Sequence, residues 1–159
     1  MNAADNAEPM LESENRIPGP ALWLTAAGFL PFAALSLAAI IAPPDQHFQV
    51  RLALNMYGAI ILSFLGGIHW GLEMGRQGTV RGAPSLSRLG ASVVPALVAW
   101  GCLAMPYDYG SAALAGAFGL MLAFDLYCAR SGLVPIWYPR LRVPVSLGVM
   151  VAILVPGAM

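Results

Sequence analysis

The sequence predicts an all-α fold, a polytopic membrane bundle of about five transmembrane helices. Composition is the first reason: 58% of the residues are hydrophobic, only 10% are charged, and the mean hydropathy is +0.71. A soluble domain usually carries about 25% charged residues. A water-soluble fold could not cover its surface with so few charges, so the surplus apolar surface is expected to face lipid. The second reason is that the apolar residues fall into long runs.

Five of these runs are the predicted spans, since a helix needs about 20 mostly apolar residues to cross a bilayer. Proline, glycine and charged residues separate the runs. The third and the fifth are short, and their helices are expected to start at the interface or to cross where the bilayer is thinner. The predicted spans are residues 20–42, 52–74, 89–105, 109–129 and 143–155, in a single transmembrane domain over residues 20–159.

The arginine residues predict the orientation of the bundle. All eight basic residues are arginine, and with five spans only Arg51 falls on the side away from the N-terminus. Cytoplasmic loops of membrane proteins carry the excess of basic residues. The N-terminus is therefore predicted to be cytoplasmic and the C-terminus to lie outside. The residues on the N-terminal side are Arg16, Arg76, Arg81, Arg88, Arg130, Arg140 and Arg142.

The first 19 residues differ in composition from the rest. They are acidic and contain two prolines, Pro9 and Pro18. Such a segment is expected to be a disordered cytoplasmic tail. A mitochondrial transit peptide would be rich in arginine and poor in acidic residues, and the first apolar run starts too late and is too long for a signal peptide. The tail is therefore predicted to be neither.

Ionisable residues inside the spans mark the candidate site, because such groups rarely face lipid. His69 and Glu73 lie four residues apart in the second span and so share a helix face, and Asp125 lies in the fourth span. The predicted orientation puts all three at a similar depth near the cytoplasmic side, where an aromatic and basic segment enters the fifth span. The candidate binding cluster is His69, Trp70, Glu73, Asp125, Trp137, Tyr138, Arg140 and Arg142.

Two interpretations of this cluster stay open. A carboxylate in hydrocarbon costs about 2.5–3.5 kcal/mol on insertion scales, so Asp125 is expected to be paired, hydrated or protonated. A partner would be Arg140, Arg142 or His69. On the first interpretation, the cluster is a buried pair that locks helices together. On the second, it binds a lipid headgroup, a small anion or a partner helix, or it relays protons.

The absence of recognisable catalytic motifs narrows the function. The sequence has no nucleophile elbow, no zinc-protease motif and no phosphate-binding loop. His47 falls on the opposite side of the membrane from His69, so no metal site is predicted, and no cofactor is predicted either. Cys102 and Cys128 fall near opposite ends of adjacent spans and are expected to be free. The net charge of zero gives no field for nucleic acid, and the chain is predicted not to be an enzyme.

Small residues form a ridge along the second span. Ala59, Ser63, Gly67, Gly71 and Gly75 recur every four residues, and the Gly67-x-x-x-Gly71 spacing is typical of membrane helices that pack closely. Gly67 and Gly71 are therefore the predicted helix-packing residues. The ridge would take either another helix of this chain or a second copy of it. The fourth span offers a similar row for such packing, which consists of Ala115, Gly119 and Ala123.

The segment Tyr57–Gly71, with its Gly66-Gly67-Ile68-His69-Trp70-Gly71 stretch, resembles the signature of a bacterial and mitochondrial membrane-protein family of unknown function that includes transmembrane protein 69. The Gly28–Phe32, Val93–Leu97 and Trp137–Arg142 segments fit the same resemblance. It implies a polytopic helical fold in a bacterial inner (plasma) membrane or its mitochondrial descendant, and the acidic tail favours the bacterial membrane. The resemblance implies no catalytic residues.

Three functions remain as hypotheses. The favoured one is a non-enzymatic helper or assembly protein in an energy-coupling membrane, which binds lipids, membrane-protein partners or further copies of itself. The alternative is a small proton-coupled or solute transporter that uses His69, Glu73 and Asp125, with Pro31 and Pro95 breaking helix hydrogen bonds within the membrane. The third is an intramembrane enzyme that acts on a lipid or quinone.

Overall fold

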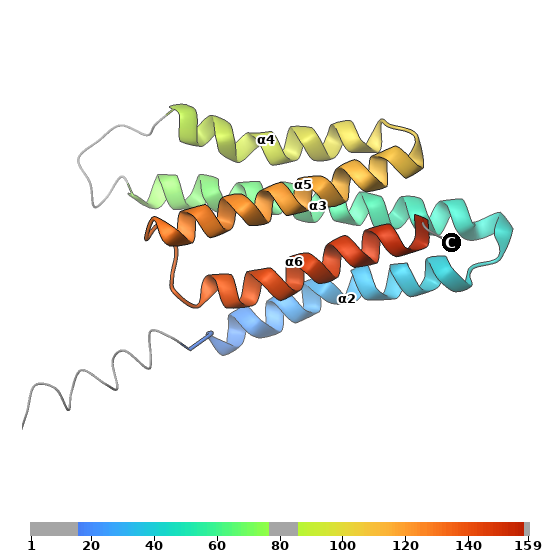
Figure 1. Cartoon of the computed structure of the whole chain (residues 1–159), viewed down its shortest axis with the longest axis horizontal. Helices are drawn as coiled ribbons and strands as arrows, with labels where there is room; N and C mark the ends of the chain where they lie inside the picture. Colours follow the sequence, from blue (N-terminus) through green and yellow to red (C-terminus); the bar gives the residue numbers. More distant parts are fainter. Residues whose placement is uncertain (1–15, 77–85, 158–159) are drawn as a thin grey trace, which may run out of the picture.

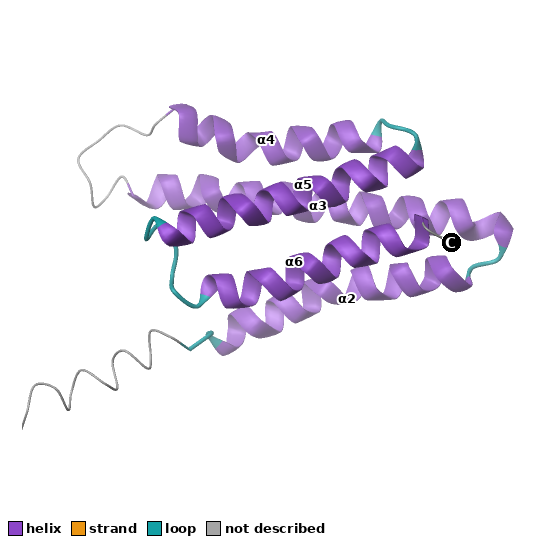
Figure 2. Cartoon of the chain, viewed as in Figure 1, coloured by secondary structure: helices purple, strands orange, loops and turns teal. Residues whose placement is uncertain are grey.

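The computed structural model describes residues 16–76 and 86–157, and helices make up most of both ranges. Figure 1 shows these helices lying side by side along one long axis. No strand occurs among the described residues, as Figure 2 also shows. The elements are α2 (Gly19–Ile41), α3 (Pro44–Arg76), α4 (Leu86–Leu103), α5 (Tyr107–Arg130), α6 (Tyr138–Leu154) and the short 3-10 helix η1 (Val155–Gly157).

The predicted all-α bundle is confirmed. Within the described ranges, three helices are long and apolar enough to cross a membrane, namely α2, α3 and α5. The apolar part of α4 is shorter, Leu89–Leu103, and α6 has 17 residues. The third and fifth predicted spans are therefore the short helices, as expected. Most of the predicted tail, residues 1–15, lies outside the described residues.

Two helices, α3 and α6, begin at least five residues earlier than the hydropathy pattern predicts. α3 starts at Pro44, because proline is well tolerated in the first turn of a helix and Asp45 there complements the helix dipole. With 33 residues α3 is roughly 50 Å long, so its polar start extends beyond an apolar layer of about 30 Å. α6 starts at Tyr138, because Pro139 likewise sits in the first turn. The expectation that residues 138–142 precede the last helix is wrong, since they form its first turns.

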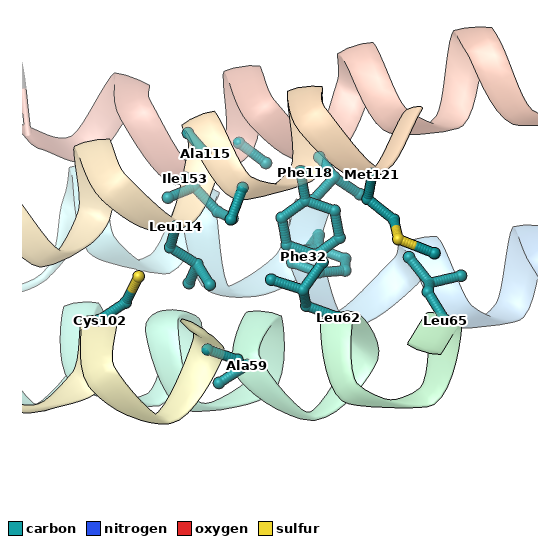
Figure 3. Close-up of a cluster of buried hydrophobic side chains, with 14 of the residues drawn as sticks. Phe32, Ala59, Leu62, Leu65, Cys102, Leu114, Ala115, Phe118, Met121 and Ile153 are labelled. Atoms are coloured by element: carbon teal, nitrogen blue, oxygen red, sulfur yellow. The ribbon is translucent and has the colours of Figure 1, made fainter. Parts of the chain in front are cut away.

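The helices pack in layers. α4 lies against α3 and α5 at one edge of the bundle, and α2 and α6 lie at the other edge (Figure 1). The buried core forms where α2, α3, α5 and α6 meet, and Figure 3 shows Phe32, Leu62, Phe118 and Ile153 converging there. The Phe32 and Phe118 rings meet edge to face with their centroids 6.1 Å apart, an arrangement that aromatic pairs prefer.

Close helix contacts depend on glycines other than the predicted ones. A Cβ atom at Gly66 would collide with the Ser92 carbonyl oxygen of α4, and one at Gly58 would press on Leu114 of α5. Gly67 and Gly71 have no such neighbour within 4 Å. The row of residues that packs within the bundle is thus displaced by one position, or about 100° around the helix.

Tight intrachain packing along Gly67 and Gly71 is therefore not found. The ridge is exposed at Gly67 and Gly71, whereas Ala59 at its other end is buried in the core. The other interpretation of the ridge, a face for a second copy of the chain, stays a prediction. The row expected on α5 is divided as well. Ala115 is buried, a Cβ atom at Gly119 would lie 3.5 Å from the Met150 sulfur atom of α6, and Ala123 is exposed.

Substitution of Gly66 by alanine should weaken the α3–α4 contact. The added methyl group forces α4 away from α3, and overpacking of this kind lowers the free energy of unfolding by about 1–3 kcal/mol. The midpoint of thermal unfolding in mild detergent should fall accordingly. Gly67→Ala is the matched control, because it adds the same methyl group to open space and improves helix propensity. Equal midpoints for the two variants would contradict the placement of α4.

Candidate functional site

Asp125 of α5 is the centre of a buried polar cluster. Its side chain is 1% exposed, and its two carboxyl oxygens have partners on two other helices. Nε of Arg142, in α6, donates to Oδ2 at 2.6 Å, and Nε2 of His69, in α3, lies 2.8 Å from Oδ1. We call His69, Asp125 and Arg142 the Asp125 cluster. It connects three helices with charge-assisted hydrogen bonds, which are about twice as strong as neutral ones.

The three residues lie on the helix faces that form the core. Asp125 continues the buried stripe of α5, which contains Phe118, Met121 and Leu122 one and two turns earlier. Arg142 starts the corresponding stripe of α6. Because residues three, four and seven positions apart share one face of a helix, Asp125 cannot turn to the surface while its stripe stays in the core. A buried charge is the result, and it needs the two partners that it has.

The arrangement fixes the direction of the hydrogen bonds. An ionised carboxylate only accepts hydrogen bonds, and arginine only donates them. In this pairing, Nε2 of His69 carries the hydrogen that is donated to Asp125. Phe124, the neighbour of Asp125 in the chain, packs on the imidazole with the ring centroids 4.8 Å apart. His69 is thus held at a fixed orientation from two sides.

Cavities adjoin the Asp125 cluster in two directions. A cavity of about 240 Å³ lies between α3, α4 and α5 and has His69, Pro95 and Phe124 among its lining residues. Another of about 490 Å³ lies between α2, α3 and α6, and Tyr138 and Arg142 line it. The Tyr138 side chain also lies close enough to interact electrostatically with the Asp125 carboxyl group. The cluster therefore links the walls of two cavities on different sides of the bundle.

The structure brings only part of the predicted cluster together. His69, Asp125, Tyr138 and Arg142 meet. Arg140, which was also considered as a partner of Asp125, does not bond to it, because its side chain points outward and is exposed. The other predicted members do not bond to Asp125. Trp70 is 43% exposed, Glu73 is half-buried, and the Trp137 ring meets Tyr138 with the centroids 6.2 Å apart.

A second set of polar contacts, which the sequence patterns above did not indicate, lies at the opposite end of the bundle. Arg51 pairs with Asp108 at 3.0 Å and lies over the Tyr107 ring at 4.0 Å. One turn deeper, the buried Asn55 amide donates to Ser111 Oγ at 2.8 Å. All of these residues belong to the starts of α3 and α5.

A regular spacing would have revealed these contacts. Asn55 and Ser111 are 56 residues apart in the chain, and so are His69 and Asp125. Two parallel helices in fixed register give such a constant offset. The pairs recur after 14 residues, which is two heptads, the repeat that keeps the same faces together in parallel packed helices. Polar residues at matching heptad positions of the two spans are therefore the sequence feature from which these contacts could be predicted.

The part of the chain that the structure describes offers no obvious metal site. It has no group of three or more histidine, cysteine, aspartate or glutamate side chains close enough to hold an ion. Cys102 and Cys128 are both buried and free. The candidate site is therefore a group of buried side chains that bond to one another. It is not a set of side chains open to a metal ion.

Comparison with known proteins agrees with the membrane character of the chain. A family model described as "Protein of unknown function (DUF3429)" matches residues 17–157. Transmembrane protein 69 of Xenopus tropicalis is 35% identical over 125 residues, which are 79% of this chain and 48% of that protein. Transmembrane protein 69 of Mus musculus is 30% identical over 139 residues, which are 87% and 55% of the two chains.

The resemblance seen around the Gly66–Gly71 stretch is confirmed by these matches. The chain spans about half the length of these curated relatives. No solved structure matches it. Together with the apolar helices, the relatives indicate a membrane protein.

Substitution of Asp125 by asparagine should destabilise the bundle strongly. The Arg142 guanidinium would stay buried without its counter-charge, and the loss of one partner of a buried pair costs about 3–5 kcal/mol. Thermal unfolding in detergent should show a large drop. Arg130→Gln, at the exposed end of the same helix, is the control and should change little.

The same measurement on a double variant separates charge from packing. Asp125→Leu combined with Arg142→Met leaves no buried charge, and well-packed apolar replacements of buried pairs are often close to neutral. The double variant should therefore be more stable than Asp125→Asn alone. If it is less stable, mutual neutralisation of the two charges is not what holds α5 and α6 together.

Proposed function

We propose that this chain, which belongs to the DUF3429 family of proteins of unknown function, is a multi-pass protein of a bacterial inner membrane that has no catalytic activity and acts by binding other components of that membrane. One observation carries the absence of catalysis. Both oxygens of the Asp125 carboxylate bond to other side chains, and the carboxylate is 1% exposed. An acid or base must reach its substrate within hydrogen-bonding distance. Both oxygen atoms of Asp125 already bond to side chains of this chain.

The outer surface supports a binding role within lipid. Large apolar side chains are exposed on several helices, among them Leu24 of α2, Phe64 of α3 and Leu120 of α5. Patches of this kind mark contacts with membranes or with other proteins. In a bilayer, lipid tails and the apolar faces of partner helices fit such a surface, so the binding partners expected are lipids, membrane proteins or further copies of this chain.

The proposed orientation has the N-terminus in the cytoplasm and the C-terminus outside. Figure 1 shows the starts of α2 and α6 and the end of α5 at one end of the bundle, and the start of α3 at the other. Arg16, Arg130 and Arg140 belong to the first end, and Arg51 to the second. This asymmetry supports the orientation, because basic residues accumulate on the cytoplasmic side.

A transporter is the second candidate. The observation that favours it is that His69 and Arg142, on either side of Asp125, line different cavities. A hydrogen-bonded chain between two cavities is the arrangement that a proton relay needs. On this alternative, the reconstituted protein moves protons in liposomes, and Asp125→Asn stops the movement.

Purification from native membranes tests the binding role. A tagged full-length chain is extracted in mild detergent and analysed by native mass spectrometry, and specific membrane proteins should be retained. Leucine at both Gly67 and Gly71 should remove them, because a Cβ atom at either position meets nothing of this chain within 4 Å and the larger side chains would cover the exposed face. Gly116→Leu is the control, since Gly116 is equally open on α5. Recovery of the wild type with no other protein would favour the transporter.

The orientation has its own test. A cysteine replaces the exposed Tyr109 at one end or the exposed Arg140 at the other, in a chain whose native cysteines are buried. A maleimide reagent that cannot cross the membrane should label Tyr109→Cys in intact spheroplasts and Arg140→Cys only after the membrane is opened. The reverse labelling pattern would overturn the orientation.

A further inference from the structure

The cavity between α2, α3 and α6 has the size and the opening of a binding site for a membrane-borne molecule. Its volume of about 490 Å³ falls within the roughly 300–1,000 Å³ of small-molecule sites. The cavity opens sideways on the apolar surface, because Leu24, Ile60 and Phe64 on its wall are 74%, 64% and 64% exposed. A ligand could therefore enter from the lipid layer without passing through water.

The polar side chains that line the cavity lie at one end. α2 and α6 start at the same end of the bundle (Figure 1). Tyr138 opens α6, Arg142 follows four residues later, and Thr25 lies six residues after the start of α2. At a rise of about 1.5 Å per residue, Thr25 and Arg142 are roughly 9 Å and 6 Å along their helices. Thr25 and Arg142 thus lie at a similar depth, and Tyr138 lies about one helical turn nearer the helix starts.

The remainder of the cavity is apolar and reaches deeper. Phe32 and Val149 on its wall lie 13 and 11 residues into α2 and α6, or about 20 Å and 16 Å along them. Ile60 on α3, which runs in the opposite direction, lies at a similar depth. The cavity therefore has a polar end near the helix starts and an apolar end near the middle of the bundle, which is the shape of an amphiphile with a single chain.

Arg142 indicates the chemistry of the polar end. Its Nε atom is used by Asp125, but its Nη2 atom is buried and has no hydrogen-bond partner within the described ranges. A buried donor that lacks an acceptor is costly, and most buried donors in proteins are satisfied. An oxygen atom of a ligand would supply the missing acceptor. Arg140, exposed at the same end of α6, adds positive charge that favours an anionic oxygen.

We propose that this cavity holds one acyl chain whose anionic oxygen head lies at Thr25, Tyr138 and Arg142. The chain of the ligand extends along Phe29, Phe32 and Phe64 toward the middle of the bundle. A free fatty acid and one chain of an anionic phospholipid share this chemistry. The inference rests on the proposed binding role and names the class of ligand for it.

Photolabelling tests the proposal. The full-length protein is reconstituted in phosphatidylcholine vesicles with a palmitic acid probe that carries a diazirine on its chain, and the crosslinked residues are mapped by mass spectrometry. Crosslinks should concentrate on the facing sides of α2, α3 and α6, and the methyl ester of the probe should label less because it lacks the anionic head. Competition by unlabelled palmitate identifies a free fatty acid as the source, and competition by phosphatidylglycerol identifies a phospholipid.

Gly28→Leu is the decisive variant. Gly28 lines the cavity, and a Cβ atom there would meet nothing within 4 Å, so leucine adds its side chain to the cavity without a clash at Cβ. Labelling should fall about ten-fold, equivalent to a weakening of affinity by 1.4 kcal/mol. Gly116→Leu, which adds the same side chain outside the cavity, should label like the wild type.

Labelling that is equal in Gly28→Leu and the wild type, or that is spread evenly over the lipid-facing helices, would overturn the proposal. If membrane proteins still co-purify in that case, the binding role of the chain stands and only the acyl ligand is rejected.

Discussion

The carboxylate of Asp125 is the interaction on which the arrangement of the bundle depends. It lies 1% exposed among core residues and joins α5 to α3 through His69 and to α6 through Arg142. Apolar packing alone discriminates poorly between neighbouring helix registers in lipid, because lipid tails are as apolar as the side chains that replace them. A buried charge allows only the arrangement in which its partners are within reach. The relative positions of three helices follow from this one residue.

The polar contacts at the other end of the bundle complete this constraint. Asn55 and Ser111, with Arg51 and Asp108 beside them, connect the starts of α3 and α5. Between the two sets of contacts lie four turns of apolar packing around Phe118. Parallel helices that are joined at two points with the same 56-residue offset cannot slide past each other. The rigid pair α3–α5 then gives α4 one side to pack on and α2 and α6 the other, which leaves the cavities at the edges of the pair.

Much of this fold could be predicted from the sequence, because the hydrophobic requirement of a membrane is simple. Long apolar runs and the breaks between them gave the five helices, and the cost of an unpaired charge required a partner for Asp125. To choose the partner of Asp125 among Arg140, Arg142 and His69, one must know how α6 is rotated about its own axis. That rotation depends on where the helix begins. The hydropathy pattern places Pro139 before the helix, although proline is well tolerated in the first turn of a helix. With the helix starting at Tyr138, Arg142 lies on the inward face of α6 and Arg140 on the outward face.

The glycine ridge shows a different limit of sequence patterns. The four-residue spacing of Gly67 and Gly71 correctly describes a smooth face, but spacing says nothing about which neighbour approaches that face. Gly58 and Gly66, eight residues apart, form an equally regular row one position away, and this row receives α4 and α5. The cavities could not be predicted for the same reason, since their walls come from helices that are distant in the sequence. Only the assembled bundle shows that Arg142 faces both Asp125 and an apolar space.

The most direct test of the central role of Asp125 is a distance measurement by solid-state NMR on the protein in lipid bilayers. Labelling the aspartate carboxyl carbons with ¹³C and the arginine and histidine side-chain nitrogens with ¹⁵N allows carbon–nitrogen dipolar couplings to be recorded. The structure predicts strong couplings from the Asp125 carboxyl carbon to Nε of Arg142 and to Nε2 of His69, as expected for hydrogen bonds of 2.6 Å and 2.8 Å. The absence of both couplings in a folded sample would contradict the account.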